Sequence, residues 1–372
     1  MVPWLVSPLE VAPTITPATR HCPKCGYAFA YRHGKRIRRI GDWKQPVVTQ
    51  VRLRCPQCGV TWTVYPQGVD PGIRRSRRAQ EFGVLLYAAG LSYRKASAAL
   101  RALDIPASPA TILRDVQNHA AREQIQAYHR LLKGKTRVRR IGVDGTSVKM
   151  AGQPADGGVV VVSDLDAGVG LLVEAVDERS REEVQGLLVE VFRALQPQEV
   201  MTDEAPVYPE AIREAAAQAE VALPQHHLCA AHFRRNKVRR LRQLEREAQK
   251  RGWGAVVMEL KALEALLRAP PWLLVLYVNA MLRRYQRAKP PGKGEKASWA
   301  YRLKLLLLDI QEKASQITGE TNNRTEQVIG RAFKIRTRMM RGFKRRDNRI
   351  RFLNLALALD ARVQREGVVY LL

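Results

Sequence analysis

The stretch RIGVDGTSVKMAGQPADGGVVVVSDLDAGVGLLVEAV, residues 140–176, decides the fold. It contains three segments rich in aliphatic and β-branched residues, separated by glycine-rich turns, which predicts a meander of three antiparallel strands. The run GGVVVVSD predicts a buried strand. An amphipathic helix is expected from about Ser180, and residues 197–219 (PQEVMTDEAPVYPEAIREAAAQA) predict one more strand and helix. The pattern indicates a mixed α+β core.

This succession of three antiparallel strands, a helix, a strand and a helix suggests an RNase H-like core. A strand ends at Asp144 and another at Asp203, and in such a sheet these first and fourth strands lie side by side. From about 233 to 315 the chain is helical and basic, so we interpret this segment as an all-α insertion. The core is expected at 138–232 and its C-terminal helices at 316–372.

Two CPxCG sequences near the N-terminus predict a zinc site. Each proline and glycine tightens a turn so that both thiolates face one ion, and four thiolates complete a closed tetrahedral site. Alternating stretches between and after the pairs indicate a β-hairpin. We therefore predict a zinc ribbon at 21–75, after a flexible arm at 1–20. The four predicted zinc ligands are Cys22, Cys25, Cys55 and Cys58.

Residues 76–130 change to a helical period and predict a helix-turn-helix domain. Gly90 ends the first helix, Ser92 caps the second, and Ser108 caps the third, with Pro109 at its first position. This spacing is typical of domains that place the third helix in the major groove of DNA, although a three-helix bundle without a DNA role has the same pattern. The inward face of the second helix is expected to contain Tyr93, Ala96, Ala99, Leu100 and Leu103.

The charge indicates a polyanionic partner. The chain has 63 Lys and Arg against 35 Asp and Glu, a net charge of +28, and the basic clusters are spread along it, so double-stranded DNA is the expected partner. The longest apolar run, PPWLLVLYVNAML, is too short to span a bilayer, so no membrane is expected; cysteine usage favours a cytoplasmic, nucleoid-associated protein. The expected DNA contacts are Arg74, Arg75, Arg77, Arg78, Thr111, Arg114, Arg234, Arg235, Lys237, Lys334, Arg336 and Arg338.

Three acids form the candidate catalytic site. Phosphodiester chemistry at neutral pH is served by two divalent ions roughly 3.5–4 Å apart, held by carboxylates, and Mg²⁺ (or Mn²⁺) prefers oxygen ligands. Asp144, Asp203 and Glu326, the last near the start of a late helix, are the expected ligands of these two ions. The competing acids are Asp164 and Asp166 for the first position, Glu204 for the second and Glu320 for the third.

The stretch CAAHFRRN, residues 229–236, holds the fifth cysteine, three residues before a histidine. As a catalytic pair, Cys229 and His232 have no evident acyl substrate. As half of a second zinc site they lack partners, although His226 and His227 lie close by. The remaining interpretation is structural, with Cys229 buried and His232 capping a helix or packed in the core.

Four motifs in order resemble DDE transposases of bacterial insertion sequences, in the Mutator-like branch. They are IGVDGTSVK, VMTDEAPVY, HHLCAAHFRRN and TNNRTEQVIGRAFKIRTRMMRGF. The CxxH pair of that branch, commonly followed by Arg-Asn, matches Cys229 and His232, and its TTNxxE-like motif matches with Asn322 replacing the second threonine, which makes Asn323 a motif residue. The resemblance covers about residues 140–362.

The resemblance implies a DNA transposase. In such an enzyme, water cuts the transposon ends and the freed 3′-OH attacks target DNA. Asp144 would bridge both metal ions, with Asp203 on one and Glu326 on the other. The CxxH pair would form the joint between the core and its insertion. Terminal inverted repeats, target DNA and a homodimer or higher oligomer are the implied partners. A catalytically inactive DNA-binding regulator and a nuclease on the same fold are the alternatives.

Overall fold

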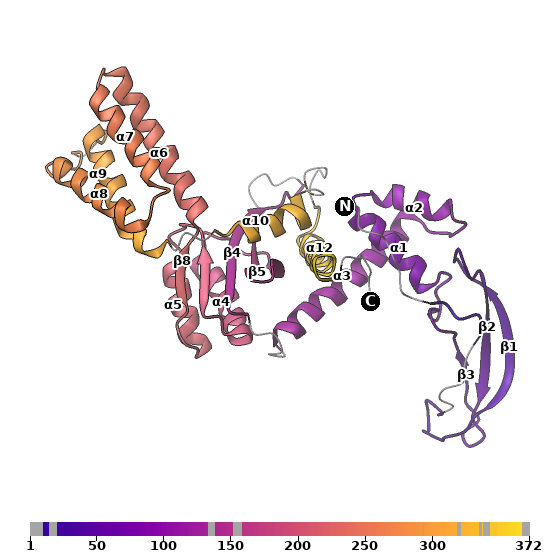
Figure 1. The fold of residues 1–372 in the computed structure, drawn as a ribbon. Coiled ribbons are helices and arrows are strands. Elements are labelled where there is room, and N and C mark those ends of the chain that lie inside the picture. The colour runs from indigo at the N-terminus through magenta and orange to yellow at the C-terminus, as the bar shows by residue number, and fades with distance from the viewer. Residues whose placement is uncertain are drawn as a thin grey trace. The chain divides into compact units, whose positions relative to one another are not determined.

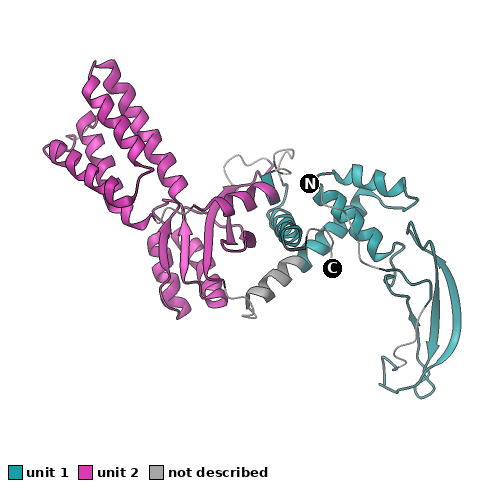
Figure 2. Ribbon diagram, viewed as in Figure 1, with its two compact units in different colours: residues 1–127, 332–372 teal, residues 128–331 magenta. Residues whose placement is uncertain are grey.

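The computed structural model divides the chain into two compact units, residues 1–127 with 332–372 and residues 128–331 (Figure 2). It describes residues 10–14, 21–132, 138–151, 158–292, 294–317, 321–334, 337 and 343–366. The fold is mixed α and β, with one sheet in each unit (Figure 1).

The first unit begins with a three-stranded antiparallel sheet in the order β1-β2-β3. As predicted, a hairpin fills the gap between the two cysteine pairs. Strand β1 forms the open edge of this sheet, and most of its residues are exposed. A small core of Val11, Ile40, Val48 and Val69 supports the sheet. The strands are β1 (Tyr31–Arg39), β2 (Val47–Arg54) and β3 (Thr61–Val64).

Three helices follow the ribbon, and the starts of the second and third agree with the predicted caps. The Ser92 hydroxyl accepts a hydrogen bond from Lys95 N at 3.3 Å, and the Ser108 hydroxyl accepts one from Thr111 N at 3.1 Å. On the second helix Ala96 and Leu100 are buried as expected, but Leu103 is exposed because the helix has already ended. The helices are α1 (Arg77–Ala88), α2 (Tyr93–Arg101) and α3 (Pro109–Leu132).

The C-terminal helix α12 (Arg346–Glu366) belongs to the same unit as α1, α2 and α3 up to Ala127. Phe352 contacts Tyr87 edge to face at a centroid distance of 5.8 Å, and Gln117 donates a hydrogen bond to Asn348 at 3.2 Å. We expected all of 316–372 to belong to the α+β core. The structure instead groups residues 332–372 with the first unit, where aromatic packing joins α12 to the N-terminal helices.

The second unit is built on a five-stranded sheet in the order β6-β5-β4-β7-β8. Strands β4, β5 and β6 form the predicted antiparallel meander, and β7 and β8 add to it in parallel. The expected pairing of the first and fourth strands is present as β4 beside β7. The strands are β4 (Arg140–Ser147), β5 (Gly158–Asp164), β6 (Val169–Glu174), β7 (Glu199–Thr202) and β8 (Gln225–Leu228).

The two faces of this sheet have different partners. Helices α4 (Arg181–Leu195) and α5 (Tyr208–Ala219) pack on one face in an apolar core that includes Ile141 and Val143 of β4. Because strand side chains alternate between faces, Gly142 and Asp144 lie on the other face, where helix α10 (Asn323–Ile329) crosses strands β4, β5 and β6. Asp144 is thus inside strand β4, and the expectation that the strand ends there is wrong: pairing with β5 continues to Ser147.

From Ala230 to Gln316 the described chain forms helices joined by loops and contains no strand, in agreement with the predicted all-α segment. A separate apolar core holds these helices together. At its centre Trp299 donates a hydrogen bond to Leu244 O at 3.0 Å. Within the described residues, no helix combines the length and hydrophobicity that crossing a membrane requires. The helices are α6 (Ala230–Lys250), α7 (Gly254–Leu266), α8 (Pro271–Tyr285) and α9 (Trp299–Lys313), followed by a 3-10 turn.

The junction between ribbon and helices depends on the buried carboxylate of Asp42. It accepts hydrogen bonds from the Arg78 guanidinium, from Ser76 Oγ at 2.5 Å and from the backbone N–H groups of Lys44 and Gln45. Burial alone would raise the pKa of Asp42, but these hydrogen bonds outweigh burial and lower the pKa to about 2.

Replacing Asp42 with Asn should therefore destabilise the first unit in a pH-dependent way. The folded pKa lies below the unfolded value of about 3.9, so the charge stabilises the fold above about pH 4 and this contribution disappears as pH falls toward 2. We expect a loss of about 2 kcal/mol at pH 7 that shrinks below pH 4, measured by urea unfolding. Asp70→Asn, which breaks the exposed pair of Asp70 with Arg77, is the control and should change stability by less than ~1 kcal/mol. A pH-independent effect of Asp42→Asn would contradict this role.

Candidate functional site

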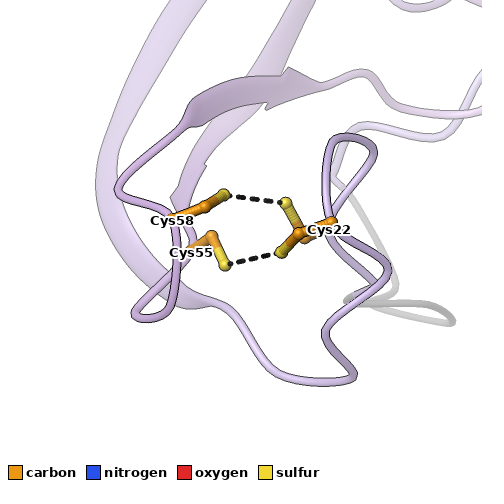
Figure 3. A group of neighbouring side chains, drawn as sticks. Cys22, Cys55 and Cys58 are labelled. Carbon is orange, nitrogen blue, oxygen red and sulfur yellow. Dashed lines mark hydrogen bonds between the residues drawn. The ribbon is translucent and has the colours of Figure 1, made fainter.

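The four cysteines of the ribbon come together in one group. Their sulfurs lie within 4.8 Å of one another, with Cys22 Sγ 3.5 Å from Cys58 Sγ and Cys25 Sγ 3.7 Å from Cys55 Sγ (Figure 3). A disulfide would need about 2.05 Å, whereas the edge of a tetrahedron with Zn–S bonds of about 2.3 Å is ~3.8 Å. The residues present therefore fit one zinc ion, as predicted.

The two cysteine turns have the same backbone hydrogen bonds. Cys22 N donates to Tyr27 O and Gly26 N to Cys22 O, while Cys55 N donates to Val60 O and Gly59 N to Cys55 O. Gly26 and Gly59 have φ of 72° and 69°, a left-handed conformation that favours glycine. The two CPxCG sequences thus form the same type of turn, and each turn contributes two sulfurs to the group.

A second group of potential ligands lies on the sheet of the second unit. Ligand atoms of Asp144, His232 and Glu326 lie within 4.8 Å of one another. His232 Nε2 is 2.8 Å from Glu326 Oε1, and Arg235 approaches the same oxygen at 3.7 Å. The structure thus brings together two of the three predicted acids, with a histidine from the first turn of α6 where the third acid was expected.

Helix α10 carries Glu326 to this position because strand β4 has a glycine beneath it. A Cβ at residue 142 would overlap Thr325 Oγ1 and Asn322 Oδ1. Asn322 Nδ2 donates to Val143 O at 3.2 Å, Thr325 donates to Asn322 Oδ1, and Ser163 Oγ lies 2.5 Å from Thr325 Oγ1. This buried network fixes the first turn of α10, which contains Glu326, against β4.

Cys229 belongs to the same hydrogen-bond network at the start of α10. Its buried sulfur accepts a hydrogen bond from Asn322 N at 3.1 Å and packs against Leu165 and Met201. The motif asparagine that reaches the core is therefore Asn322, which is fully buried, while Asn323 is exposed. Among the described residues, Cys229 joins no group of three potential metal ligands, and His226 bonds instead with Thr202 Oγ1 at 2.9 Å. The structural interpretation of Cys229 fits this geometry; a second zinc half-site does not.

The pKa values of the acidic group reflect crowding of like charges. Burial, together with Glu178, Asp203 and Glu326, raises the pKa of Asp144 to about 7, although His232 acts in the opposite direction. The pKa of His232 rises to about 9, first through the neighbouring Cys229 sulfur and then through Asp144 and Glu326. The buried Nδ1 of His232 has no hydrogen-bond partner in the described part of the chain. Without a metal ion, His232 is thus a cation at neutral pH that partly neutralises the carboxylates.

Two further carboxylates influence this group. Asp203 directly follows β7, as predicted; its Oδ1 accepts from Ala205 N at 2.9 Å, and it lies outside the group with ligand atoms within 4.8 Å. Glu178, which the sequence analysis missed, precedes α4. It accepts a hydrogen bond from Tyr208 OH at 2.6 Å, and a Cβ at Gly145 would overlap its carboxylate. The sequence signal that could have indicated a neighbouring side chain here is Gly145, which directly follows Asp144 in the strand.

The donor set fits a divalent cation. Two carboxylates supply the oxygens that Mg²⁺ and Mn²⁺ prefer, and a histidine nitrogen suits transition metals better than Mg²⁺. The Nε2–Oε1 distance of 2.8 Å is close to the edge of an octahedron with bonds of about 2.1 Å, ~3.0 Å. An ion bound here would favour ionised Asp144 and neutral His232.

The competing acids have structural partners elsewhere. Asp164 Oδ1 accepts from the N–H groups of Asp166 and Ala167 in the turn after β5, and Asp166 pairs with Arg140 at 2.7 Å. Glu204 pairs with Lys237 at 2.5 Å. Glu320 lies outside the described residues. Of the three preferred acids, Asp144 and Glu326 lie in the group of close ligand atoms, whereas Asp203 lies outside it.

Several of the expected DNA contacts are buried in ion pairs. Lys237 is 2% exposed between Glu204 and Asp309. Arg75 pairs with Asp115 at 2.6 Å, and Arg78 pairs with Asp42. Acids distant in sequence supply these counter-charges, which is why the basic clusters alone suggested free surface. These three residues are therefore corrected to structural roles.

The remaining expected contacts are more accessible. Thr111 is half-buried and bonds with Ser108, and Arg234 Nε donates to Leu267 O at 3.0 Å. Arg336 and Arg338 lie outside the described residues. The exposed ones are Arg74, Arg77, Arg114, Arg235 and Lys334.

Removing one ribbon cysteine should remove the zinc. We expect Cys22→Ser and Cys55→Ser to lose about one zinc per chain by metal analysis, because a closed site needs all four thiolates. Cys229→Ser, which changes the cysteine outside the group, is the control and should keep the zinc of the wild type. Equal zinc in all variants would contradict the ribbon site.

Adding one methyl group at residue 142 should disturb the acidic group without touching any of its ligands. In Gly142→Ala the new Cβ displaces α10 and with it Glu326, so we expect Mn²⁺ affinity to fall by roughly 10–100-fold in calorimetric titration of the zinc-loaded protein. Gly186→Ala in α4, where a Cβ meets nothing within 4 Å, is the matched control and should bind as the wild type does. Unchanged Mn²⁺ affinity in Gly142→Ala would exclude this positioning role.

Comparisons with known proteins do not identify the chain. Its sequence matches no protein-family model, and a search of curated proteins finds no significant match. The interpretation of the site therefore depends on its residues and their geometry.

Proposed function

We propose that the chain is a DNA transposase with an RNase H-like core that uses a metal-dependent acidic site. The observation that carries the proposal is the grouping of Asp144, His232 and Glu326 on one face of the sheet, with Asp203 after the neighbouring strand. Three antiparallel strands followed by two parallel ones, with α4 and α5 on the opposite face, agree with such a core. The resemblance of four motifs to Mutator-like DDE transposases supports the same assignment.

The proposed chemistry assigns a task to each residue. Asp144, Asp203 and Glu326 would hold two Mg²⁺ or Mn²⁺ ions, which supply charge neutralisation for attack on a phosphodiester. Arg235, which is exposed beside Glu326, would contact a phosphate of the bound strand. Asn322, Thr325 and Cys229 would keep Glu326 in place without touching the DNA.

The first unit would recognise the transposon ends. A zinc ribbon followed by three capped helices is a common arrangement for sequence-specific DNA binding. Helix α3 presents exposed Arg114, helix α1 begins with exposed Arg77, and exposed Arg74 lies just before α1. Two ends have to be brought together for transposition, so we expect a homodimer or higher oligomer on DNA.

A nuclease on the same fold is the second candidate. The same acidic group, with Glu178 as a further carboxylate near Asp144 and Asp203, also suits metal-dependent hydrolysis without strand transfer. Strand transfer distinguishes the two: a transposase joins the cut 3′ end to target DNA, while a nuclease releases it.

The decisive test first searches the DNA on both sides of the coding sequence for inverted repeats and then measures metal-dependent cleavage of DNA that carries them. Asp144→Asn, Asp203→Asn and Glu326→Gln should each lower strand cleavage by ~1,000-fold or more, because each removes a ligand charge, while end binding changes by less than about threefold. Asp166→Asn is the control and should retain cleavage, since Asp166 lies in a turn and pairs with Arg140. The proposal would be refuted if all three variants still cleaved DNA. It would also be refuted if only the Asp166→Asn control lost cleavage.

A further inference from the structure

The helical insertion contains a basic groove that the acidic site does not account for. Helices α6 and α7 line a groove of about 1190 Å³, and the residues along it include seven basic side chains against two glutamates. Five of the arginines lie on α6, and four of these form a regular series: Arg235, Arg239, Arg242 and Arg246. Their spacing of four, three and four residues places them on one face of the helix.

The two glutamates are committed to ion pairs inside the groove. Glu264 pairs with Arg242 at 3.0 Å, and Glu245 lies 3.9 Å from Lys261. Arg239, Arg246 and Arg268 are exposed. The groove therefore keeps a surplus of exposed positive charge after its internal pairs have formed.

The groove is held open by the fold and leads to the acidic group. Arg234 Nε donates to Leu267 O at 3.0 Å, which ties the first turns of α6 to the end of α7. Ala231 and Arg235, which flank His232, line one end of the groove, and Arg235 lies 3.7 Å from Glu326. Along α6 the lining residues run from Ala231 to Arg246, about 22 Å at 1.5 Å per residue.

We propose that this groove, defined by the α6–α7 arginines, binds the phosphate backbone of a DNA strand and leads it to the acidic site. At a rise of 3.4 Å per nucleotide, 22 Å corresponds to roughly six nucleotides. Arginines one turn apart along one helix face follow a regularly charged backbone, and their contacts are independent of base sequence. The inference deepens the proposed function and rests on it for the choice of DNA as the polyanion.

The test compares two triple variants of the full chain. The groove variant is Arg239→Gln with Arg246→Gln and Arg268→Gln. The matched control is Arg283→Gln with Arg287→Gln and Lys289→Gln, which removes the same charge from exposed positions of the same insertion outside the groove lining. Binding of a fluorescein-labelled 20-bp DNA duplex is measured by anisotropy at 50–300 mM NaCl without divalent ions, after circular dichroism has shown equal helix content.

Each phosphate contact contributes about 0.9 to the slope of log K against log salt. We expect the groove variant to lower the slope by about 2–3 and to bind ~10-fold more weakly at 100 mM NaCl, while the control stays within ~0.5 of the wild-type slope. Equal slopes in the two variants would overturn the proposal. Poly-glutamate is the second probe: if the groove variant loses as much affinity for it as for DNA, the assignment to DNA is wrong.

The outcome is independent of cleavage. Because the assay contains no divalent ion, an inactive acidic site leaves the slopes unaffected. If the groove variant bound and cleaved DNA as the wild type does, the groove proposal would be wrong. The proposed transposase function would not be affected.

Discussion

Helix α10 can lie against strand β4 only because residue 142 has no side chain. The space that a Cβ would occupy is taken by polar atoms of Asn322 and Thr325, which bond to one another, to the carbonyl of Val143 and to Ser163. A buried polar network is costly when any member is unsatisfied, so these bonds specify one register of helix against strand. Glu326 directly follows Thr325 in the first turn of α10 and lies close to Asp144, which is two residues beyond Gly142 on the same face of β4. The acidic group is thus a consequence of this close approach.

The charges gathered by this arrangement oppose one another. Asp144 is buried and near Glu178, Asp203 and Glu326, so its pKa rises to about 7. His232 offsets part of the repulsion as a cation, with its pKa raised to about 9. Groups whose ionisation is disfavoured by one another are typical of sites that bind cations, because an ion relieves the repulsion that folding has imposed. In a chain of net charge +28, the acidic group is a local exception that attracts cations, while the surrounding surface attracts anions.

Elements that depend on local sequence patterns were predictable from the sequence. The acidic partners that neutralise buried basic residues were not, because they are distant in the sequence. The cysteine turns, the meander and the helical segment follow from local spacing and alternation, whereas the pairing of β4 with β7 was expected only from the order of strands and helices in an RNase H-like sheet. Glu178 was missed because it lies between a strand and a helix, where no periodicity indicates which way a side chain faces. Lys237 was misassigned because its partners Glu204 and Asp309 are 33 and 72 residues away. Asn323 was preferred to Asn322 on motif spacing alone, although burial reverses the choice.

Helix α6 has two side-chain stripes that explain how one segment serves both the core and the site. Phe233, Lys237, Leu241, Leu244 and Ala248 form the buried stripe, and the ion pairs of Lys237 fix the rotation of the helix about its axis. With that rotation fixed, His232 faces the acidic group. Positions at the same three- and four-residue spacing, from Arg235 to Arg246, continue along the groove. Because one stripe contains both His232 and the arginines, the proposed DNA strand that follows the arginines along α6 would reach Glu326 and Asp144. Buried Lys237 therefore sets the direction of the arginine-lined groove relative to the acidic group, although Lys237 itself belongs to neither.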